Sequence, residues 1–190
     1  MKNTLRLLLI VLVIMTIAYV FYLGKNNSDT SSSSTSSTKS ASAIQVLDLS
    51  NKNLTQATAD IYGKTATTEL ILSHNSIRTL PGEMGKMKNV VVFRIDHNLL
   101  DGSLIGEIRH MSQLRTLDVS DNNMTGVPAE IGQLSNLISL NYSNNHITGL
   151  PNELARLKNN LKEFNLTGNP LSKSQIETLK IALPNTTIIF

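Results

Sequence analysis

The sequence of 190 residues contains no cysteine. This absence excludes disulfide bonds, zinc sites built from thiolates, catalysis by a thiol and the lipid-modified cysteine of bacterial lipoproteins. Tryptophan is absent too, and four tyrosines with four phenylalanines offer no platform on which nucleobases would stack. The formal charge of +3 comes from the N-terminal segment, because Lys and Arg balance Asp and Glu from residue 44 onward. We therefore expect no nucleic-acid partner.

Motifs typical of enzymes are missing as well. The sequence has no glycine-rich phosphate loop, no H-E-x-x-H zinc motif and no G-x-S-x-G nucleophile turn. Serine, histidine and aspartate stand together at Ser73-His74 and Ser120-Asp121, but their positions follow the phase of an internal repeat and indicate no enclosed pocket. We expect neither enzymatic activity nor a bound cofactor.

The N-terminal segment carries a long apolar run. Residues 7–23 are uncharged and nearly all apolar, a length at the short end of what spans a bilayer, and a snorkelling Arg6 extends it to residues 5–23. Residues 1–25 are therefore predicted to be a signal anchor with a cytoplasmic N-terminus, because Lys2 and Arg6 precede the run. The rest of the chain would then lie outside the cell membrane. A cleaved signal peptide is the alternative, and it would give a secreted protein.

Residues 26–43 are rich in serine and threonine. Such a composition buries too little apolar surface to order itself, so we expect a flexible linker with an end-to-end distance on the order of 20–25 Å. Its predicted role is to space the following domain from the membrane.

A short pattern recurs through the remainder of the chain. In residues 114–124 it reads L-x-x-L-x-L-x-x-N-x-L, and an apolar residue followed by proline comes shortly after it. The second leucine of the pattern has equivalents every 23 or 24 residues, at Leu47, Leu70, Phe93, Leu117, Leu140, Phe164 and Ile188. The asparagine column reads Lys52, Asn75, Asn98, Asn122, Asn145 and Asn169. Because one unit cannot bury its own apolar face, the copies are expected to stack.

In these columns, residues 44–190 resemble the leucine-rich repeat family. The resemblance implies an α/β fold, an open solenoid with parallel strands on the concave face and short helices or helical turns on the convex face. About six repeats would be followed by a capping helix and strand, and the N-terminal transmembrane helix would precede them. Secreted animal and plant members usually have caps stapled by cysteines, so the lack of cysteine favours a bacterial source.

Each later repeat joins a strand to a return segment. The return segments read as short helices or helical turns, in which Pro128 and Pro151 suit the first turn and Glu130 favours the N-terminal end of the helix dipole. Where the strand turns, backbone groups lose their ladder partners while still buried. A carboxamide supplies both donors and an acceptor, so the asparagine column is predicted to be scaffold.

The C-terminal repeat has the signals of a cap. Ser172 and Gln175 fit a capping box at the start of a helix, and Pro184 ends the run. Residues 187–190 are then expected to add a final strand.

The variable positions of the strands would face the concave side. The centre of that face is predicted to carry a mixed apolar and charged surface for a protein partner, formed by Ile71, His74, Val92, Arg94, Asp96, His97, Asp118 and Asp121. The competing interpretation is a set of solvated residues against which nothing packs.

Two histidines and an aspartate share one column. His74, His97 and Asp121 would place two imidazoles beside a carboxylate, which is a constellation able to bind a metal ion. We expect no metal site there, because the column is exposed, lacks identifiable supporting contacts and comes from adjacent rungs that do not converge. His110 and His146 lie outside the column and are expected at the surface.

The resulting hypothesis is a membrane-tethered leucine-rich repeat module that is displayed on the outer side of the membrane and binds a protein through its concave face. One alternative is a structural or glycan-associated protein of the cell envelope without a discrete protein ligand. The other is a cytoplasm-facing scaffold, which requires the inverted membrane topology.

Overall fold

The computed structural model describes residues 44–190. The predicted signal anchor (1–25, with the membrane span 5–23) and the predicted linker (26–43) lie outside the described residues. Within residues 44–190, no helix combines the length and the apolar character needed to cross a bilayer.

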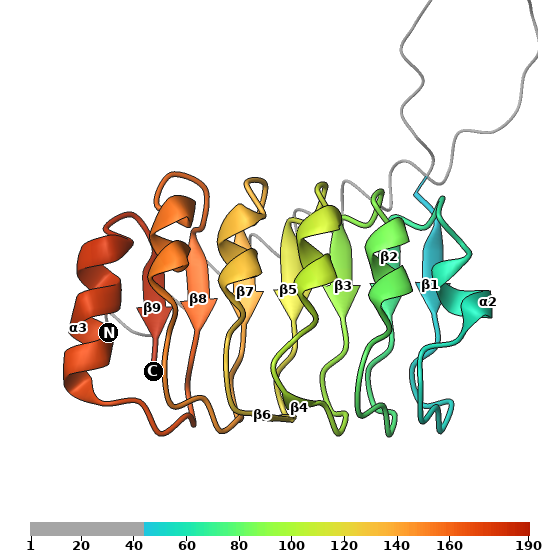
Figure 1. The fold of residues 1–190 in the computed structure, drawn as a ribbon, viewed down its shortest axis with the longest axis horizontal. Helices are drawn as coiled ribbons and strands as arrows, with labels where there is room; N and C mark the ends of the chain where they lie inside the picture. Colours follow the sequence, from blue (N-terminus) through green and yellow to red (C-terminus); the bar gives the residue numbers. More distant parts are fainter. Residues whose placement is uncertain (1–43) are drawn as a thin grey trace, which may run out of the picture. The chain divides into compact units, whose positions relative to one another are not determined.

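Seven short strands form one parallel sheet in the order β1-β2-β3-β5-β7-β8-β9 (Figure 1). They are β1 (Val46–Asp48), β2 (Glu69–Ile71), β3 (Val92–Arg94), β5 (Thr116–Asp118), β7 (Ser139–Asn141), β8 (Glu163–Asn165) and β9 (Thr187–Ile189). The register pairs Leu47 with Leu70 at one end and Phe164 with Ile188 at the other. The residues of the leucine column, aligned from the sequence, are therefore the residues that pair in the sheet. We number the coils 1 to 6 from strands β1, β2, β3, β5, β7 and β8, and β9 follows coil 6.

Each coil returns through a short helical segment on the opposite side from the strands (Figure 1). These segments are α2 (Ala59–Tyr62) in coil 1 and the 3-10 helices η1 (Gly82–Lys86), η2 (Gly106–His110), η3 (Ala129–Gln133) and η4 (Asn152–Leu157) in coils 2 to 5. A 3-10 helix rises about 2.0 Å per residue, against 1.5 Å in an α-helix, so a few residues bridge the coil. The predicted helical turns are therefore confirmed, in their tighter form.

The prolines of the return segments stand one position earlier than predicted. Pro128 and Pro151 are N-cap residues in an extended conformation, with φ of −72° and −74°, and the helices begin after them. Coil 3 has Ile105 at this position, with φ of −63° and ψ of 143°. The same backbone path therefore forms without proline. The proline ring only fixes φ near the value that the native structure requires.

A second sheet was not predicted from the sequence. It has two parallel strands, β4 (Asp101–Gly102) and β6 (Asn123–Met124), which follow the main strands of coils 3 and 4. The C-terminal cap agrees with the prediction, because α3 (Lys173–Ala182) begins with a capping box. The Gln175 N–H donates to Ser172 Oγ, and the Ser172 N–H donates to Gln175 Oε1.

One continuous apolar core runs through the coils. Leu70, Phe93 and Leu117 are fully buried, and burying such side chains contributes about 1.5–3 kcal/mol each. Leu47 of coil 1 is only partly buried, since no coil within residues 44–190 covers its N-terminal side. Close contact between η3 and η4 requires glycine at position 132, where a Cβ atom would lie 2.2 Å from the carbonyl oxygen of Glu153.

The asparagine column satisfies buried backbone groups, as predicted. Asn122 Oδ1 accepts the N–H of Leu100 in coil 3, and its Nδ2 donates to the carbonyls of Ile95 in coil 3 and Val119 in its own coil. The same set of bonds recurs at Asn75, Asn98, Asn145 and Asn169. Each asparagine thus bonds to the preceding coil. Among the described residues no coil precedes coil 1, which explains why Lys52 is tolerated there.

We expect the substitution Asn122→Ala to lower the free energy of unfolding by about 1–3 kcal/mol. It leaves the buried N–H of Leu100 without its acceptor, and one unsatisfied group of this kind costs about 1–3 kcal/mol. The carbonyls of Ile95 and Val119 each keep a second donor, from Asn98 and Asn145. The neighbouring Asn123 is exposed, so Asn123→Ala is the matched control and should change stability by less than about 0.5 kcal/mol. Urea unfolding of both variants measures the difference, and equal losses would contradict the scaffold role.

Tyr142 is the exception within the apolar core. Its ring is fully buried and packs edge-to-face against Phe164, with ring centroids 6.3 Å apart. Among the described residues, its hydroxyl is a buried polar group without a hydrogen-bond partner. Burial in the apolar interior also raises the pKa of the phenol. Leu72, Ile95 and Val119 occupy the equivalent position in coils 2 to 4, so the hydroxyl is not required by the fold.

We therefore expect Tyr142→Phe to raise the free energy of unfolding by about 1 kcal/mol, because it removes an unsatisfied buried hydroxyl. The raised pKa means that the native state retains the phenol proton when the unfolded chain loses it. Stability is then complete below the ordinary pKa of about 10 and falls as pH rises above it. Urea unfolding at pH 7 and pH 10.5 should show the gap between the variant and the wild type widening. A gap that narrows at high pH would contradict this account.

Candidate functional site

We call the outward side of the seven-stranded sheet the sheet face. It carries a ladder of polar side chains, most of which bond to another group of their own coil. In coil 4, Asp118 Oδ1 accepts both the N–H and the hydroxyl of Ser120, at 3.0 and 2.7 Å. Asn141 with Ser143 and Asn165 with Thr167 form the same pair of bonds in coils 5 and 6. These side chains have partners within their own coils, which lowers their demand for an external ligand.

Coil 1 follows the same rule. The backbone N–H of Ser50 donates to Asp48 Oδ1 at 2.9 Å. This bond, with a smaller contribution from the Ser50 side chain, holds the pKa of the Asp48 carboxyl below its ordinary value.

Coils 2 and 3 interrupt this ladder. The position held elsewhere by Asp or Asn is Ile71 in coil 2 and Arg94 in coil 3. Ser73 therefore lacks an acceptor in its own coil, and its hydroxyl donates across to Asp96 Oδ1 of coil 3. Within residues 44–190, Arg94 is exposed and forms no salt bridge with a carboxylate. The interruption thus leaves an aliphatic side chain and a cation available to solvent.

The backbone conformation restricts which residue types occur in the column that follows each strand by three positions. Asn51, His74, His97, Asp121 and Asn144 all have φ between 52° and 57°, and Gly168 has φ of 75°. Asn, Asp, His and Gly are the residues most often found in this left-handed region. The repeat pattern therefore restricts which side chains the column accepts, and the histidines of coils 2 and 3 satisfy that restriction.

His74, Asp96 and His97 form a compact cluster. The two imidazole rings are stacked with centroids 4.2 Å apart and planes at 29°. His97 Nδ1 lies 3.0 Å from Asp96 Oδ2 and 3.8 Å from Asp121 Oδ2. One nitrogen or oxygen atom from each of His74, Asp96 and His97 lies within 4.8 Å of the others. Contrary to the expectation from the sequence, adjacent rungs do converge here, and Asp96 takes the place predicted for Asp121.

All eight residues predicted for the partner surface lie on neighbouring coils 2 to 4. We call them the sheet patch: Ile71, His74, Val92, Arg94, Asp96, His97, Asp118 and Asp121. Ile71, Arg94 and Asp118 are in register on β2, β3 and β5 and form one row. None of the eight is buried, and the His97 side chain is 50% exposed.

One residue beside the sheet patch was not predicted from the sequence. Val46 is 55% exposed and is in register with Glu69, which in turn pairs with Val92. It extends the apolar part of the surface into coil 1. The signal was present in the aligned strand column, where Val46 and Val92 are its two valines.

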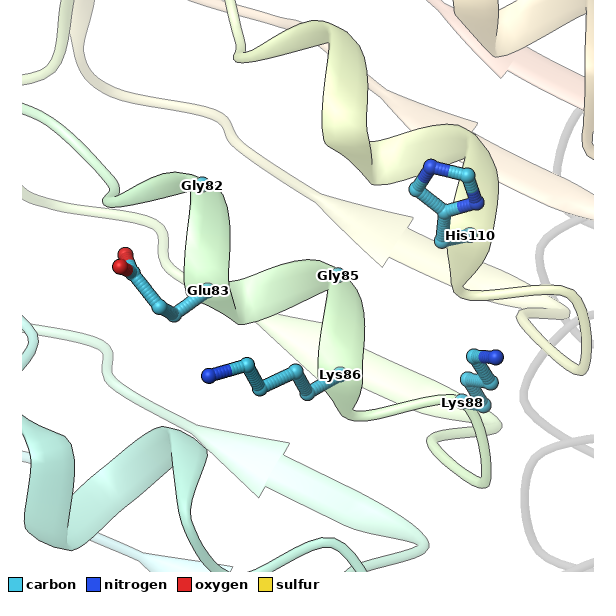
Figure 2. A pocket seen from close by; sticks show the side chains of 6 residues that line it. All are labelled: Gly82, Glu83, Gly85, Lys86, Lys88 and His110. Atoms are coloured by element: carbon cyan, nitrogen blue, oxygen red, sulfur yellow. The ribbon is translucent and has the colours of Figure 1, made fainter.

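A second feature lies on the helical side. A shallow depression of about 570 Å³ is bordered by Gly82, Glu83, Gly85, Lys86, Lys88 and His110 (Figure 2). These positions lie in the variable return segments, where the repeat pattern gives no functional signal. His110 and His146 are both exposed, as predicted.

Comparison with known proteins agrees with the fold. Residues 65–124 and 112–171, together more than half of the chain, match the leucine rich repeat family. The leucine-rich repeat and fibronectin type III domain-containing protein 1 of Danio rerio is 35% identical over 63 residues, which are 33% of this chain and 11% of that protein. The chain therefore spans only about a tenth of the length of this relative.

Solved structures show the same architecture. A leucine-rich repeat protein from Leptospira interrogans is 29% identical, with a TM-score of 0.58 over 73% of this chain and 41% of that one. The ectodomain of the membrane receptor kinase GASSHO1/SCHENGEN3 from Arabidopsis thaliana, in complex with Casparian strip integrity factor 2, has a TM-score of 0.64 over 76% of this chain and 18% of that one. The latter is 24% identical, so it shows the fold alone. The predicted solenoid with parallel strands is confirmed.

Proposed function

The chain belongs to the leucine-rich repeat family, and on this basis we propose that it binds a protein partner through the sheet patch. Leucine-rich repeat domains generally mediate binding between proteins, and an open array presents a surface rather than an enclosed pocket. The proposal assigns no catalytic step to the chain.

The observation that carries the proposal is the interruption of the polar ladder in coils 2 and 3. Where the ladder is intact, Asp118 and the asparagines of coils 5 and 6 already bond to a neighbouring hydroxyl. Where it is broken, Ile71 and Arg94 face solvent without such a partner among the described residues. Arginine is enriched among the residues that dominate binding energy at protein interfaces, and an aliphatic neighbour adds apolar contact area.

The patch indicates the chemistry of its partner. Ile71 and Val92 offer apolar contact, and Arg94 offers a planar cation that suits a carboxylate in a two-bond arrangement. The neighbouring rungs lie about 4.8 Å apart, so an extended segment crossing the strands would meet these groups in turn. We infer a partner segment with an aliphatic side chain close to an acidic one.

The alternative of a glycan ligand finds less support. The Ser, Asn and Asp residues that would serve a carbohydrate are the ones already engaged with each other, as in Asn141 with Ser143. A glycan would have to replace these bonds before it gained its own.

The charge reversal Arg94→Glu tests the binding surface. Used as bait in affinity capture from cells that naturally produce the protein, the full chain with this change should recover its main partner more than about tenfold less than the wild type does, because a buried interfacial charge would be inverted. Quantitative mass spectrometry of the captured proteins measures the recovery.

Arg156→Glu is the matched control, because Arg156 is exposed on η4, on the helical side of the array. It makes the same charge change and should leave recovery unaltered. Recovery of the same partner by all three proteins would overturn the assignment to the sheet patch, and so would a loss with Arg156→Glu alone.

We propose further that residues 5–23 tether the repeats to the outer side of the cell membrane. The apolar run and the basic residues before it support this orientation. Protease added to intact cells should then degrade residues 44–190, as followed by an antibody against the repeats. Protection in intact cells, together with degradation after lysis, would reject the outward orientation in favour of a cytoplasm-facing scaffold.

A further inference from the structure

We propose that His74, Asp96 and His97 bind a divalent transition-metal ion of the zinc class on the sheet face. The proposal goes beyond partner binding and departs from the expectation drawn from the sequence, in which adjacent rungs were not expected to converge. It rests on the arrangement of the three side chains and of the groups that hold them.

The spacing of the ligand atoms suits one ion. Zinc binds histidine nitrogen and carboxylate oxygen at about 2.0–2.2 Å, so neighbouring ligands of a tetrahedral ion lie roughly 3.3 Å apart. The cluster keeps one ligand atom of each residue within 4.8 Å of the others, and the closest pair, His97 Nδ1 and Asp96 Oδ2, is separated by 3.0 Å. Because the lone pairs of an imidazole lie in the ring plane and the two rings are stacked, binding of one ion requires the side chains to rotate until the three atoms point at one position. The ion would then replace the proton between His97 and Asp96.

The side chains are held in place by their surroundings. Both histidines stand on turns of positive φ in consecutive coils, and their rings stack at 4.2 Å. The Ser73 hydroxyl donates to Asp96 Oδ1, so the carboxylate is oriented with Oδ2 toward His97. Ser73 is itself buried. Outer contacts of this kind orient the ligands of metal sites and increase their affinity.

A further carboxylate adds negative charge beside the cluster. Asp121 Oδ2 lies 3.8 Å from His97 Nδ1, and its other oxygen accepts a hydrogen bond from Asn144 Nδ2 at 2.8 Å. Two carboxylates thus face the position of a doubly charged cation. Arg94, the cation of the sheet patch, lies on β3 two residues before Asp96, and it forms no salt bridge with Asp96 in the described residues.

The ligand types select the class of ion. Two imidazoles with one carboxylate favour zinc, nickel or copper, whereas calcium and magnesium prefer oxygen ligands alone. Three protein ligands leave at least one coordination position for water or for a group of another molecule. The site is therefore open and exchangeable, and we expect affinity below that of closed structural zinc sites.

The test is a titration of the full chain with zinc chloride, in which isothermal titration calorimetry measures the binding. The expected result is one zinc ion per chain for the wild type and no comparable binding of calcium chloride. His74→Asn and His97→Asn should each weaken zinc binding by more than about tenfold, the scale found even for losses outside the coordination shell. Asparagine tolerates positive φ, so both variants retain the turn.

His146→Asn is the matched control, because it removes an exposed imidazole outside the cluster. It should bind zinc like the wild type, and Arg94→Glu should still bind zinc even though it disrupts the proposed partner surface. Unchanged affinity in His74→Asn or His97→Asn, or a loss in His146→Asn, would overturn the proposal.

A second measurement needs no variant. In nuclear magnetic resonance spectra of the wild type, one equivalent of zinc should shift the imidazole signals of His74 and His97 and leave those of His110 and His146 unmoved. Equal shifts in all four histidines would mean scattered surface binding only and would overturn the proposal.

Discussion

The structure depends on one constraint, which is that buried backbone groups must have hydrogen-bond partners where each strand leaves the sheet. A strand that turns away from its neighbours would otherwise leave N–H and C=O groups unpaired in the apolar core. The asparagine column meets this need, with Oδ1 as acceptor and Nδ2 as donor, for example at Asn98. Because the carboxamide must reach the same groups in every coil, the repeat length varies only between 23 and 24 residues. The in-phase apolar column and the parallel register of the sheet follow from that regularity.

The same regularity explains what could be predicted from the sequence. The apolar column with its seven members predicted the register of the sheet, because a constant repeat length brings equivalent residues side by side. The capping box at Ser172 predicted α3, because a helix start depends on the few residues around it. The strand pair β4 and β6 had no signal, since it joins turn segments by backbone groups only. The position of Pro128 was misjudged by one residue, because proline suits both an N-cap and a first helical turn.

The candidate site was harder to predict for a geometric reason. Counting residues placed His74, His97 and Asp121 in one column, and the structure keeps them there. The backbone at His74, His97 and Asp121 has positive φ, which changes the direction of their side chains. Asp96, which belongs to the preceding column, therefore lies within reach of His97. The cross-coil bond from Ser73 arises only because Ile71 removes its usual acceptor. The bond from Ser73 to Asp96 depends on residues in two coils and on Ile71 in one of them. Aligning each column separately does not reveal it.

The asparagine bonds also have a direction, and that direction affects how the protein is made. Each carboxamide serves the coil before its own, as Asn145 does for Met124 and Val119 of coil 4. During synthesis from the N-terminus, a coil that has left the ribosome already has the bonds of its own asparagine, such as that from Asn122 to Val119. It still lacks the acceptor for the N–H after its turn, which the asparagine of the next coil supplies about one repeat later, as Asn145 does for Met124. Folding of the solenoid on the ribosome should therefore lag translation by about one coil, and the most recently synthesised coil should be the least stable.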